Sequence, residues 1–125
     1  MAKKRILVVD DEVALTRMVK LNLERTGNYE VRTENQGPMA IPAALEFNPD
    51  LMLLDVMMPG MTGDEIAAQL KEDPALSHIK FIFVTAIITK SETDSIGANI
   101  GGNVFLAKPI KADELISTIE QVLGG

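Results

Sequence analysis

Six acidic, hydroxyl or basic residues follow short apolar runs of the chain: Asp10, Asp11, Glu12, Asp55, Thr85 and Lys108. Aspartates brought together repel one another, and a fold gathers carboxylates only where a cation or a proton neutralises them. The ligands would be carboxylate oxygens, because the chain has no cysteine and a single histidine. Such oxygens favour a hard cation, and Mg²⁺ fits best. The pattern predicts an acidic magnesium site with a hydroxyl and an ammonium beside it.

Each of these residues also has an ordinary structural explanation when it is taken alone. Asp11 could cap the helix that follows it, and Asp55 could be a turn residue. Thr85 alone could be an ordinary β-branched strand residue, and Lys108 alone could be a solvated surface charge. The functional interpretation therefore depends on elements that bring all of them to one place.

Five short apolar runs along the chain predict the strands that would do so. They are Arg5–Val9, Tyr29–Thr33, Leu51–Leu54, Lys80–Val84 and Val104–Leu106. Three runs are almost continuous Ile, Leu, Val and Phe, which indicates strands buried on both faces of a parallel sheet. From Tyr29 to Glu34, by contrast, apolar and charged residues alternate, which favours a half-exposed strand at an edge.

Apolar residues at helical spacing separate these strands. The clearest stripe consists of Leu115, Ile116, Ile119, Val122 and Leu123. An earlier stripe consists of Leu15, Met18, Val19 and Leu23, and Gly27 ends it as a C-cap glycine does. Two helical segments are weaker, because Pro38 and Pro42 should distort one and Thr89–Gly102 is polar and rich in glycine.

Repeated strand–helix alternation predicts an α/β fold with a parallel sheet and helices on both faces. Ligands of such sheets bind at the carboxyl ends of the strands, where the six polar residues lie. The length of 125 residues is that of one domain, and 46% hydrophobic with 24% charged residues is ordinary globular composition.

Charge and hydropathy exclude several classes of protein. The net charge of −6 repels phosphate backbones, so we expect no direct binding to nucleic acid. The absence of cysteine fits a reducing compartment. We find no signal peptide, and the apolar run Phe81–Ile88 is far shorter than the roughly 20 residues that span a bilayer. A cytoplasmic protein without a membrane partner is expected.

The motifs around the polar residues resemble the receiver domain of two-component response regulators. The segments that carry the resemblance are Val8–Glu12, Leu53–Gly63, Val84–Ala86 and Phe105–Pro109. Their order and spacing agree with the family from Lys3 to Leu123. The resemblance implies a single, chemotaxis-regulator-like receiver domain over residues 1–125. Its implied fold is a flavodoxin-like, doubly wound sheet of five parallel strands in the order 2-1-3-4-5.

The same resemblance implies a role for each residue of the site. Asp55 would be the phosphoacceptor, with Thr85 and Lys108 in contact with the phosphoryl group. Mg²⁺ would be held by the carboxylates of Asp10, Asp11 and Asp55 and by the backbone carbonyl of Met57. The peptide bond before Pro109 would be cis, turning Lys108 toward the site.

The resemblance also implies how phosphorylation would be read out. Thr85 would move toward the phosphoryl group, and Phe105 would rotate inward behind it. This would change the face formed by the fourth helix, within Thr89–Gly102, the fifth strand and the last helix. Because Ser91–Gly102 is polar and holds glycines, we expect it to rearrange easily.

Partners and output follow from the family in the same way. The phosphoryl donor would be a phosphohistidine of a sensor histidine kinase or of a histidine phosphotransfer protein, and small acyl phosphates are possible chemical donors. A downstream protein would bind the switched face of a monomer or of a phosphorylation-induced dimer. We expect no enzyme activity beyond the protein's own aspartyl phosphorylation and dephosphorylation.

Met57 and Ile87 lie two positions after Asp55 and Thr85, respectively. Such apolar side chains cannot orient an attacking water, so we expect dephosphorylation to be slow.

Three other interpretations compete with this one. A flavodoxin-like cofactor binder needs a glycine- and hydroxyl-rich loop for the FMN phosphate, where this chain has the repelling acids Asp10 to Glu12. A hydrolase with an aspartyl-phosphate intermediate needs an additional acid–base residue and a substrate lid, and neither is visible in the sequence. The chain could also be a receiver module cut from a larger regulator or a hybrid kinase.

Overall fold

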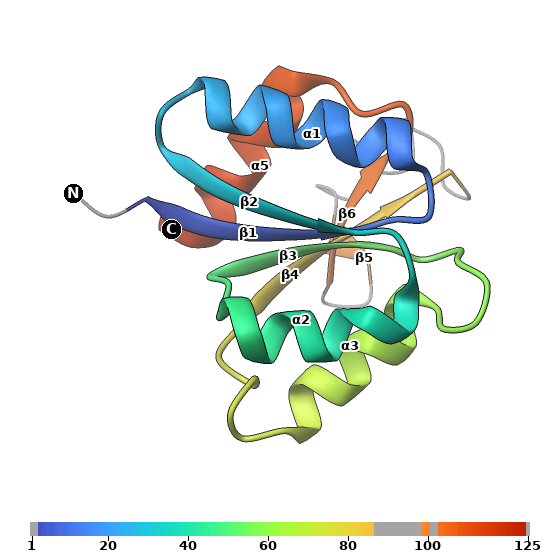
Figure 1. Ribbon diagram of the computed structural model, residues 1–125. Coiled ribbons are helices and arrows are strands. Elements are labelled where there is room, and N and C mark those ends of the chain that lie inside the picture. The colour runs from blue at the N-terminus through green and yellow to red at the C-terminus, as the bar shows by residue number, and fades with distance from the viewer. Residues whose placement is uncertain (1–2, 87–98, 101–102, 125) are drawn as a thin grey trace.

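The computed structural model describes residues 3–86, 99–100 and 103–124, in which one sheet lies between two layers of helices (Figure 1). The strands are β1 (Lys4–Val9), β2 (Tyr29–Glu34), β3 (Leu51–Asp55), β4 (Lys80–Thr85), β5 (Asn99–Ile100) and β6 (Asn103–Ala107). The helices are α1 (Val13–Arg25), α2 (Ala40–Phe47), α3 (Gly63–Glu72) and α5 (Ala112–Gly124), with a 3₁₀ turn, η1 (Gly37–Met39). None of the described helices has both the length and the apolar character needed to cross a bilayer.

The parallel part of the sheet has the predicted strand order. From one edge to the other the order is β2-β1-β3-β4-β6-β5, and the first five strands run parallel. Counting parallel strands alone, this is the order 2-1-3-4-5 of a flavodoxin-like fold. The predicted edge position of β2 is confirmed.

The two-residue strand β5 was not predicted, and it pairs antiparallel with β6. The helix expected over Thr89–Gly102 therefore does not include Asn99 and Ile100. The open edge of β6 offers backbone hydrogen bonds to the β-branched Ile100 and to its neighbour Asn99. A glycine-rich segment, by contrast, gains little from helix formation. Residues 89–98 and 101–102 lie outside the described part of the chain.

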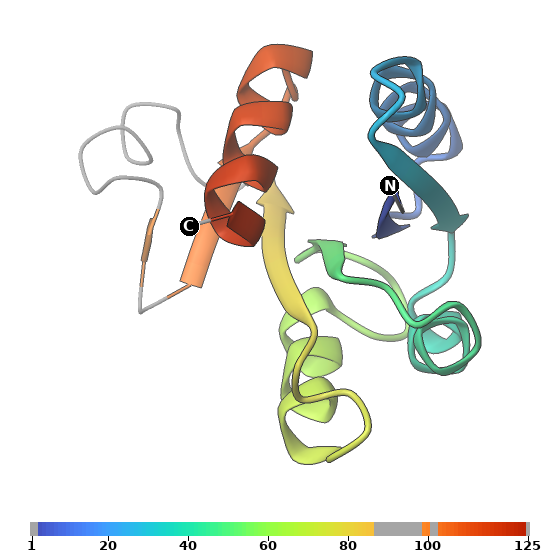
Figure 2. The ribbon, with the colours of Figure 1, turned by 90° about the vertical axis from the view of Figure 1, so that its left-hand side faces the viewer.

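Helices cover both faces of the sheet, so alternate strand residues enter two separate cores (Figure 2). The core beneath α1 and α5 contains Ile6, Val8, Val19, Leu23, Leu51, Leu53, Ile82, Val84, Leu115 and Ile119. The core beneath α2 and α3 contains Leu7, Val9, Ala40, Ala44, Met52, Leu54, Ile66, Leu70 and Phe83. Because each central strand contributes to both, its sequence is apolar throughout.

Three local expectations have definite outcomes. The distortion predicted from Pro38 and Pro42 takes the form of η1, after which α2 begins at Ala40 and carries Pro42 in its first turn. The first turn is where a missing backbone N–H costs least, because it would have no intrahelical partner there.

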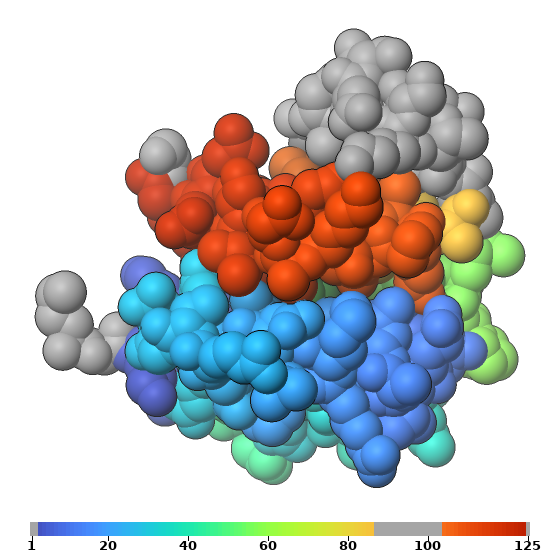
Figure 3. All heavy atoms as spheres, turned by 90° about the horizontal axis from the view of Figure 1, so that it is seen from above, coloured from blue at the N-terminus to red at the C-terminus, as the bar shows by residue number. Residues whose placement is uncertain are grey.

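Gly27, with φ of +83°, follows the end of α1 as predicted. Met18 does not join the buried stripe of α1, since it is 38% exposed and lines a hollow together with Pro109 and Ile110 of the β6–α5 loop. Helices α1 and α5 lie next to each other in Figure 3.

Helix α1 also covers the outer edge of β2 at Val31. The Glu24 carboxylate accepts a hydrogen bond from the Val31 backbone N–H at 3.1 Å, and the Lys20 ammonium donates one to the Val31 carbonyl at 2.7 Å. The two side chains also pair with each other at 3.0 Å. The hydrogen bond from Lys20 holds the pKa of Glu24 below its ordinary value, although partial burial of the carboxylate acts in the opposite direction. The pair thus occupies the backbone groups that an approaching strand would use.

Replacing Glu24 with Ala should therefore expose the Val31 amide to exchange. Loss of a hydrogen bond to a charged acceptor is expected to speed local exchange by about tenfold. Amide exchange followed by NMR measures this directly. The matched control is Glu30→Ala, since the Glu30 side chain pairs with Arg5 at 3.6 Å instead. Equal rates at Val31 in both variants would show that α1 does not protect this edge.

Candidate acidic phosphoacceptor site

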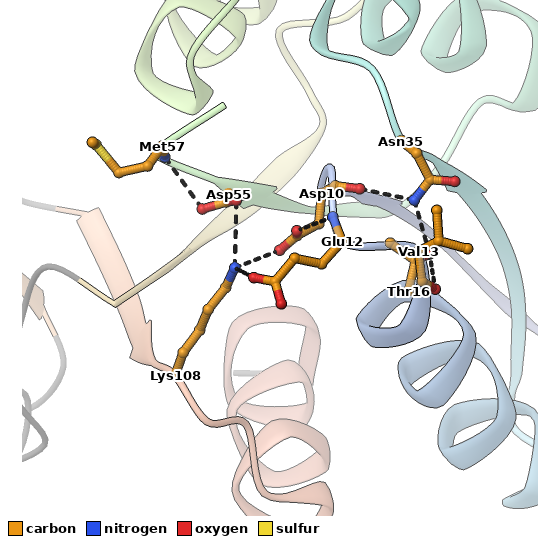
Figure 4. A network of polar contacts seen from close by, with 8 residues as sticks. All are labelled: Asp10, Glu12, Val13, Thr16, Asn35, Asp55, Met57 and Lys108. Carbon is orange, nitrogen blue, oxygen red and sulfur yellow. Dashed lines mark hydrogen bonds and ion pairs between the residues drawn. The ribbon is translucent and has the colours of Figure 1, made fainter. Parts of the chain in front are cut away.

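The carboxyl ends of three strands bring distant side chains into one pocket (Figure 4). Asp10 follows β1, Asp55 ends β3, and Lys108 follows β6. Val9 lies opposite Leu54 in the parallel register, so the next residues of the two strands, Asp10 and Asp55, are neighbours. Both are buried, with 2% and 3% of their surface exposed.

A third carboxylate joins these two from the solvent side. Carboxylate oxygens of Asp10, Asp11 and Asp55 lie within 4.8 Å of one another, and Asp11 is exposed. The N-cap position of α1 is occupied by Glu12, which excludes the interpretation of Asp11 as its helix cap. The predicted convergence of three aspartates at one end of the sheet is therefore present.

Lys108 supplies the positive charge that faces this cluster. Its Nζ atom lies 2.7 Å from Glu12 Oε1, 3.0 Å from Asp10 Oδ2 and 3.4 Å from Asp55 Oδ2. Only 13% of the side chain is exposed. Burial by itself would lower the pKa of Lys108, but the neighbouring carboxylates of Glu12 and Asp10 outweigh it and raise that pKa. Lys108 therefore stays charged at neutral pH.

The carboxylates respond in the opposite direction. Burial, followed by the charge of Asp10, raises the pKa of Asp55 to about 6, against the opposing effects of Lys108 and of the Met57 backbone N–H. Burial likewise raises the pKa of Asp10, although the Glu12 N–H and Lys108 favour its ionised form. One ammonium thus faces two buried carboxylates, and their raised pKa values show that it costs free energy to ionise both.

One oxygen of the cluster tests whether a divalent cation fits here. Asp10 Oδ1 accepts a hydrogen bond from the Glu12 backbone N–H at 2.9 Å. Asp10 Oδ2 is buried and accepts no hydrogen bond from the described residues, although Lys108 Nζ lies near it without hydrogen-bond geometry. The Lys108 ammonium, 3.0 Å from this oxygen, is one positive charge shared by three carboxylates. A buried anionic oxygen is costly unless cations neutralise it, so a second cation would stabilise the cluster. Three carboxylates with such an oxygen fit a divalent ion that prefers oxygen ligands.

The loop after Asp55 is held close to the acidic cluster. Asp55 Oδ1 accepts a hydrogen bond from the Met57 backbone N–H at 3.2 Å, while the Met57 side chain is 61% exposed. The loop ends at α3, whose start is stabilised by a capping box between Thr62 and Glu65. Gly63 follows at the first position of the helix, where a Cβ atom would lie 2.5 Å from the Asp55 carbonyl oxygen. Any side chain at Gly63 would therefore push α3 away from the site.

Thr85 and Phe105 lie on the neighbouring strands β4 and β6. Thr85 is fully buried at the end of β4, and its carbonyl accepts a hydrogen bond from the Lys108 backbone N–H at 3.0 Å. Phe105 is half-buried on β6, opposite Phe83 in register, with 5.2 Å between the ring centroids. The peptide bond between Lys108 and Pro109 is cis, the isomer that the resemblance implied.

Two residues that the structure connects to the site received no individual role from the sequence, although the first of them was already placed among the polar residues at this edge. One is Glu12, the nearest partner of Lys108. The other is Asn35, whose side-chain amide donates hydrogen bonds to the Asp10 carbonyl at 2.8 Å and to Thr16 Oγ1 at 3.0 Å. Asn35 directly follows β2, so the rule that residues after parallel strands meet at one edge would have found it.

Comparisons with known proteins agree on one family. The family model "Response regulator receiver domain" matches residues 6–120. The chain is 34% identical to the polar-differentiation response regulator DivK of Brucella anthropi over 121 residues, which is 97% of either protein. It is 38% identical to the protein PilH of Pseudomonas aeruginosa over 124 residues, covering 97% of this chain and 98% of PilH.

Longer relatives and solved structures give the same result. The response regulator PleD of Caulobacter vibrioides is 42% identical over 106 residues, but that match spans 23% of PleD and 85% of this chain. The crystal structure of the Vibrio cholerae chemotaxis protein CheY4 superposes with a TM-score of 0.82 at 29% identity. It covers 98% of this chain and 100% of CheY4.

The raised pKa of Asp55 predicts how stability depends on pH. Its value is 3.8 ordinarily and about 6 in the folded protein, so the folded state favours the proton and loses stability as pH rises from about 4 through 6. Asp55→Asn abolishes this ionisation. In metal-free buffer the variant should be more stable than wild type by about 1–3 kcal/mol near neutral pH, and this advantage should shrink below about pH 4.

Urea unfolding of both proteins, near neutral pH and again below about pH 4, measures this difference in the free energy of unfolding. Glu72→Gln, which removes an exposed carboxylate at the end of α3, is the matched control. An equal advantage of Asp55→Asn at both pH values would contradict the electrostatic explanation.

Proposed function

The chain belongs to the receiver-domain family of response regulators, and from this premise we propose that it is a signalling switch controlled by phosphorylation of Asp55. It is a two-component response regulator receiver, a type of domain that conventionally has no enzyme activity beyond its own phosphorylation chemistry. The observation that carries the proposal is the set of three aspartates whose oxygens lie within 4.8 Å of one another, with Lys108 beside them. We propose that residues 1–125 form one receiver domain.

Asp55 is the nucleophile in the proposed reaction. One of its carboxylate oxygens attacks phosphorus, and the bond between phosphorus and the imidazole nitrogen of a phosphohistidine breaks. The imidazole keeps the electron pair of that bond and takes a proton from solvent. With a pKa of about 6, Asp55 is mostly ionised at neutral pH and so has the electron pair that the attack needs. The donor belongs to a cognate histidine kinase or to a histidine phosphotransfer protein.

We propose that the carboxylates of Asp10, Asp11 and Asp55 hold Mg²⁺ together with the backbone carbonyl of Met57. The ion supplies positive charge that offsets the charge of the phosphoryl oxygens. The buried Asp10 Oδ2 and the all-oxygen donor set support a divalent ion at this position. Lys108 forms an ion pair with the phosphoryl group, and the Thr85 hydroxyl donates a hydrogen bond to one of its oxygens.

The output is proposed to pass through Thr85 and Phe105. Phe105 borders a hollow of about 440 Å³, whose described lining also includes Val56, Asp64, Ala67, Ala68, Lys71 and Phe83. This space supports a rotation of the Phe105 ring when Thr85 moves toward a phosphoryl group. The described part of the face expected to respond comprises β6 and α5, and a downstream protein would bind there. The fourth helix of this expectation, within Thr89–Gly102, falls mostly outside the described residues.

Phosphorylation by acetyl phosphate tests the acceptor. With Mg²⁺ present, intact-protein mass spectrometry should detect one added phosphoryl group on the wild type and none on Asp55→Asn. Asp50→Asn is the matched control, because Asp50 precedes the same strand at its opposite end and should leave labelling unchanged. A phosphoryl group that remains on Asp55→Asn would refute the assignment, and labelling that does not depend on Mg²⁺ would refute the metal's role.

Met57 should set how long the phosphoryl group persists. Its side chain is exposed while its backbone contacts Asp55, so a substitution changes the mouth of the site without disturbing the core. An amide at this position can orient an attacking water, and Met57→Asn should therefore shorten the lifetime about fivefold or more. The decay is followed by mass spectrometry after removal of the donor. Met57→Leu is the apolar control, and equal lifetimes in both variants would refute this explanation.

A further inference from the structure

Glu12 connects two loops that are far apart in the sequence. It lies between β1 and α1, whereas Lys108 lies between β6 and α5. Of the three carboxylates around the Lys108 ammonium, that of Glu12 is the nearest, at 2.7 Å, and Figure 4 shows the two side chains meeting at the rim of the acidic pocket. Glu12 is nevertheless outside the group of three aspartates that could share one metal ion.

The ammonium lies against two of the carboxylates that a divalent cation would use. Lys108 lies against Asp10 Oδ2 and Asp55 Oδ2, and both residues belong to the cluster that fits a metal. A cation bound there competes with the ammonium for these two carboxylates. Because the Lys108 side chain is 13% exposed, its charge is largely shielded from water and requires another partner.

The geometry points to Glu12 as that partner: we propose that Glu12 is a positioning residue that holds the Lys108 ammonium at the rim of the pocket while Asp10 and Asp55 bind a divalent cation. Glu12 thereby favours cation binding without touching the cation. The inference rests on the proposed function, because it presupposes a cation at these carboxylates. Without the Glu12 carboxylate, Asp10 and Asp55 are the ion-pair partners that remain to the ammonium among the described residues, and it competes with the cation for both.

The surroundings of the ion pair support this role. The Glu12 side chain is 60% exposed and so has room to follow the ammonium. Both residues line a hollow of about 510 Å³ between α1 and the β6–α5 loop, whose other described lining residues are Ala14, Leu15, Met18, Pro109 and Ile110. These residues are apolar, so the carboxylate of Glu12 is the negative charge in the lining of this hollow that can hold the ammonium.

A double-mutant cycle separates this role from a simple effect of charge. The dissociation constant of Mg²⁺ is measured by calorimetry for wild type, Glu12→Gln, Lys108→Met and the double variant. Glu12→Gln should raise that constant about threefold or more when Lys108 is present, and by less than about 1.5-fold in the Lys108→Met background. An equal factor in both backgrounds means that Glu12 acts through its charge alone and overturns the inference.

A second variant gives a readout that does not require Lys108→Met to fold. Glu12→Asp keeps the charge but shortens the side chain by one methylene, so it should weaken Mg²⁺ binding as Glu12→Gln does. Wild-type affinity in Glu12→Asp overturns the inference while leaving the proposed function intact. Wild-type protein that binds no Mg²⁺ overturns the cation site itself and the role of Glu12 with it.

Discussion

The repulsion between two buried carboxylates, balanced by one lysine, is the interaction on which the rest of this structure depends. The parallel register of β1 and β3 makes Asp10 and Asp55 neighbours in a place that water barely reaches. Each negative charge makes ionisation of the other carboxyl group less favourable, and burial raises the pKa of both. Lys108 offsets part of this cost from a third strand end. Such a site fits a divalent cation and, under the proposed function, a phosphoryl group on Asp55.

The alternation of side chains along the strands places Thr85 and Phe105 on the same face of the sheet. In β6, Phe105 belongs to the core beneath α2 and α3, whereas Leu106 belongs to the core beneath α1 and α5. By the same alternation, Thr85 follows Phe83 on the α2 and α3 side of β4. Thr85 and Phe105 therefore share one side of the sheet. Under the proposed function, a change at Asp55 can reach Phe105 through adjacent strands without passing through the core beneath α1 and α5.

Helices and side chains close the sheet where its backbone would otherwise be open. At the β2 edge, Lys20 and Glu24 of α1 bind the outward N–H and C=O of Val31. At the opposite edge, β5 pairs with β6. The acidic end is fixed by Asn35, which ties the end of β2 to the Asp10 carbonyl.

The sequence by itself determined the strands, their burial and the convergence of Asp10, Asp55 and Lys108, because continuous apolar runs and strand-end polar residues are local patterns with one physical solution. The proline distortion before α2 was predictable for the same reason. The tertiary structure alone decided that Glu12 reaches Lys108, that Met18 stays exposed, and that Asn99 and Ile100 form a strand. Each of these depends on what another segment brings alongside, and no local pattern of residues encodes the position of a neighbour distant in the chain.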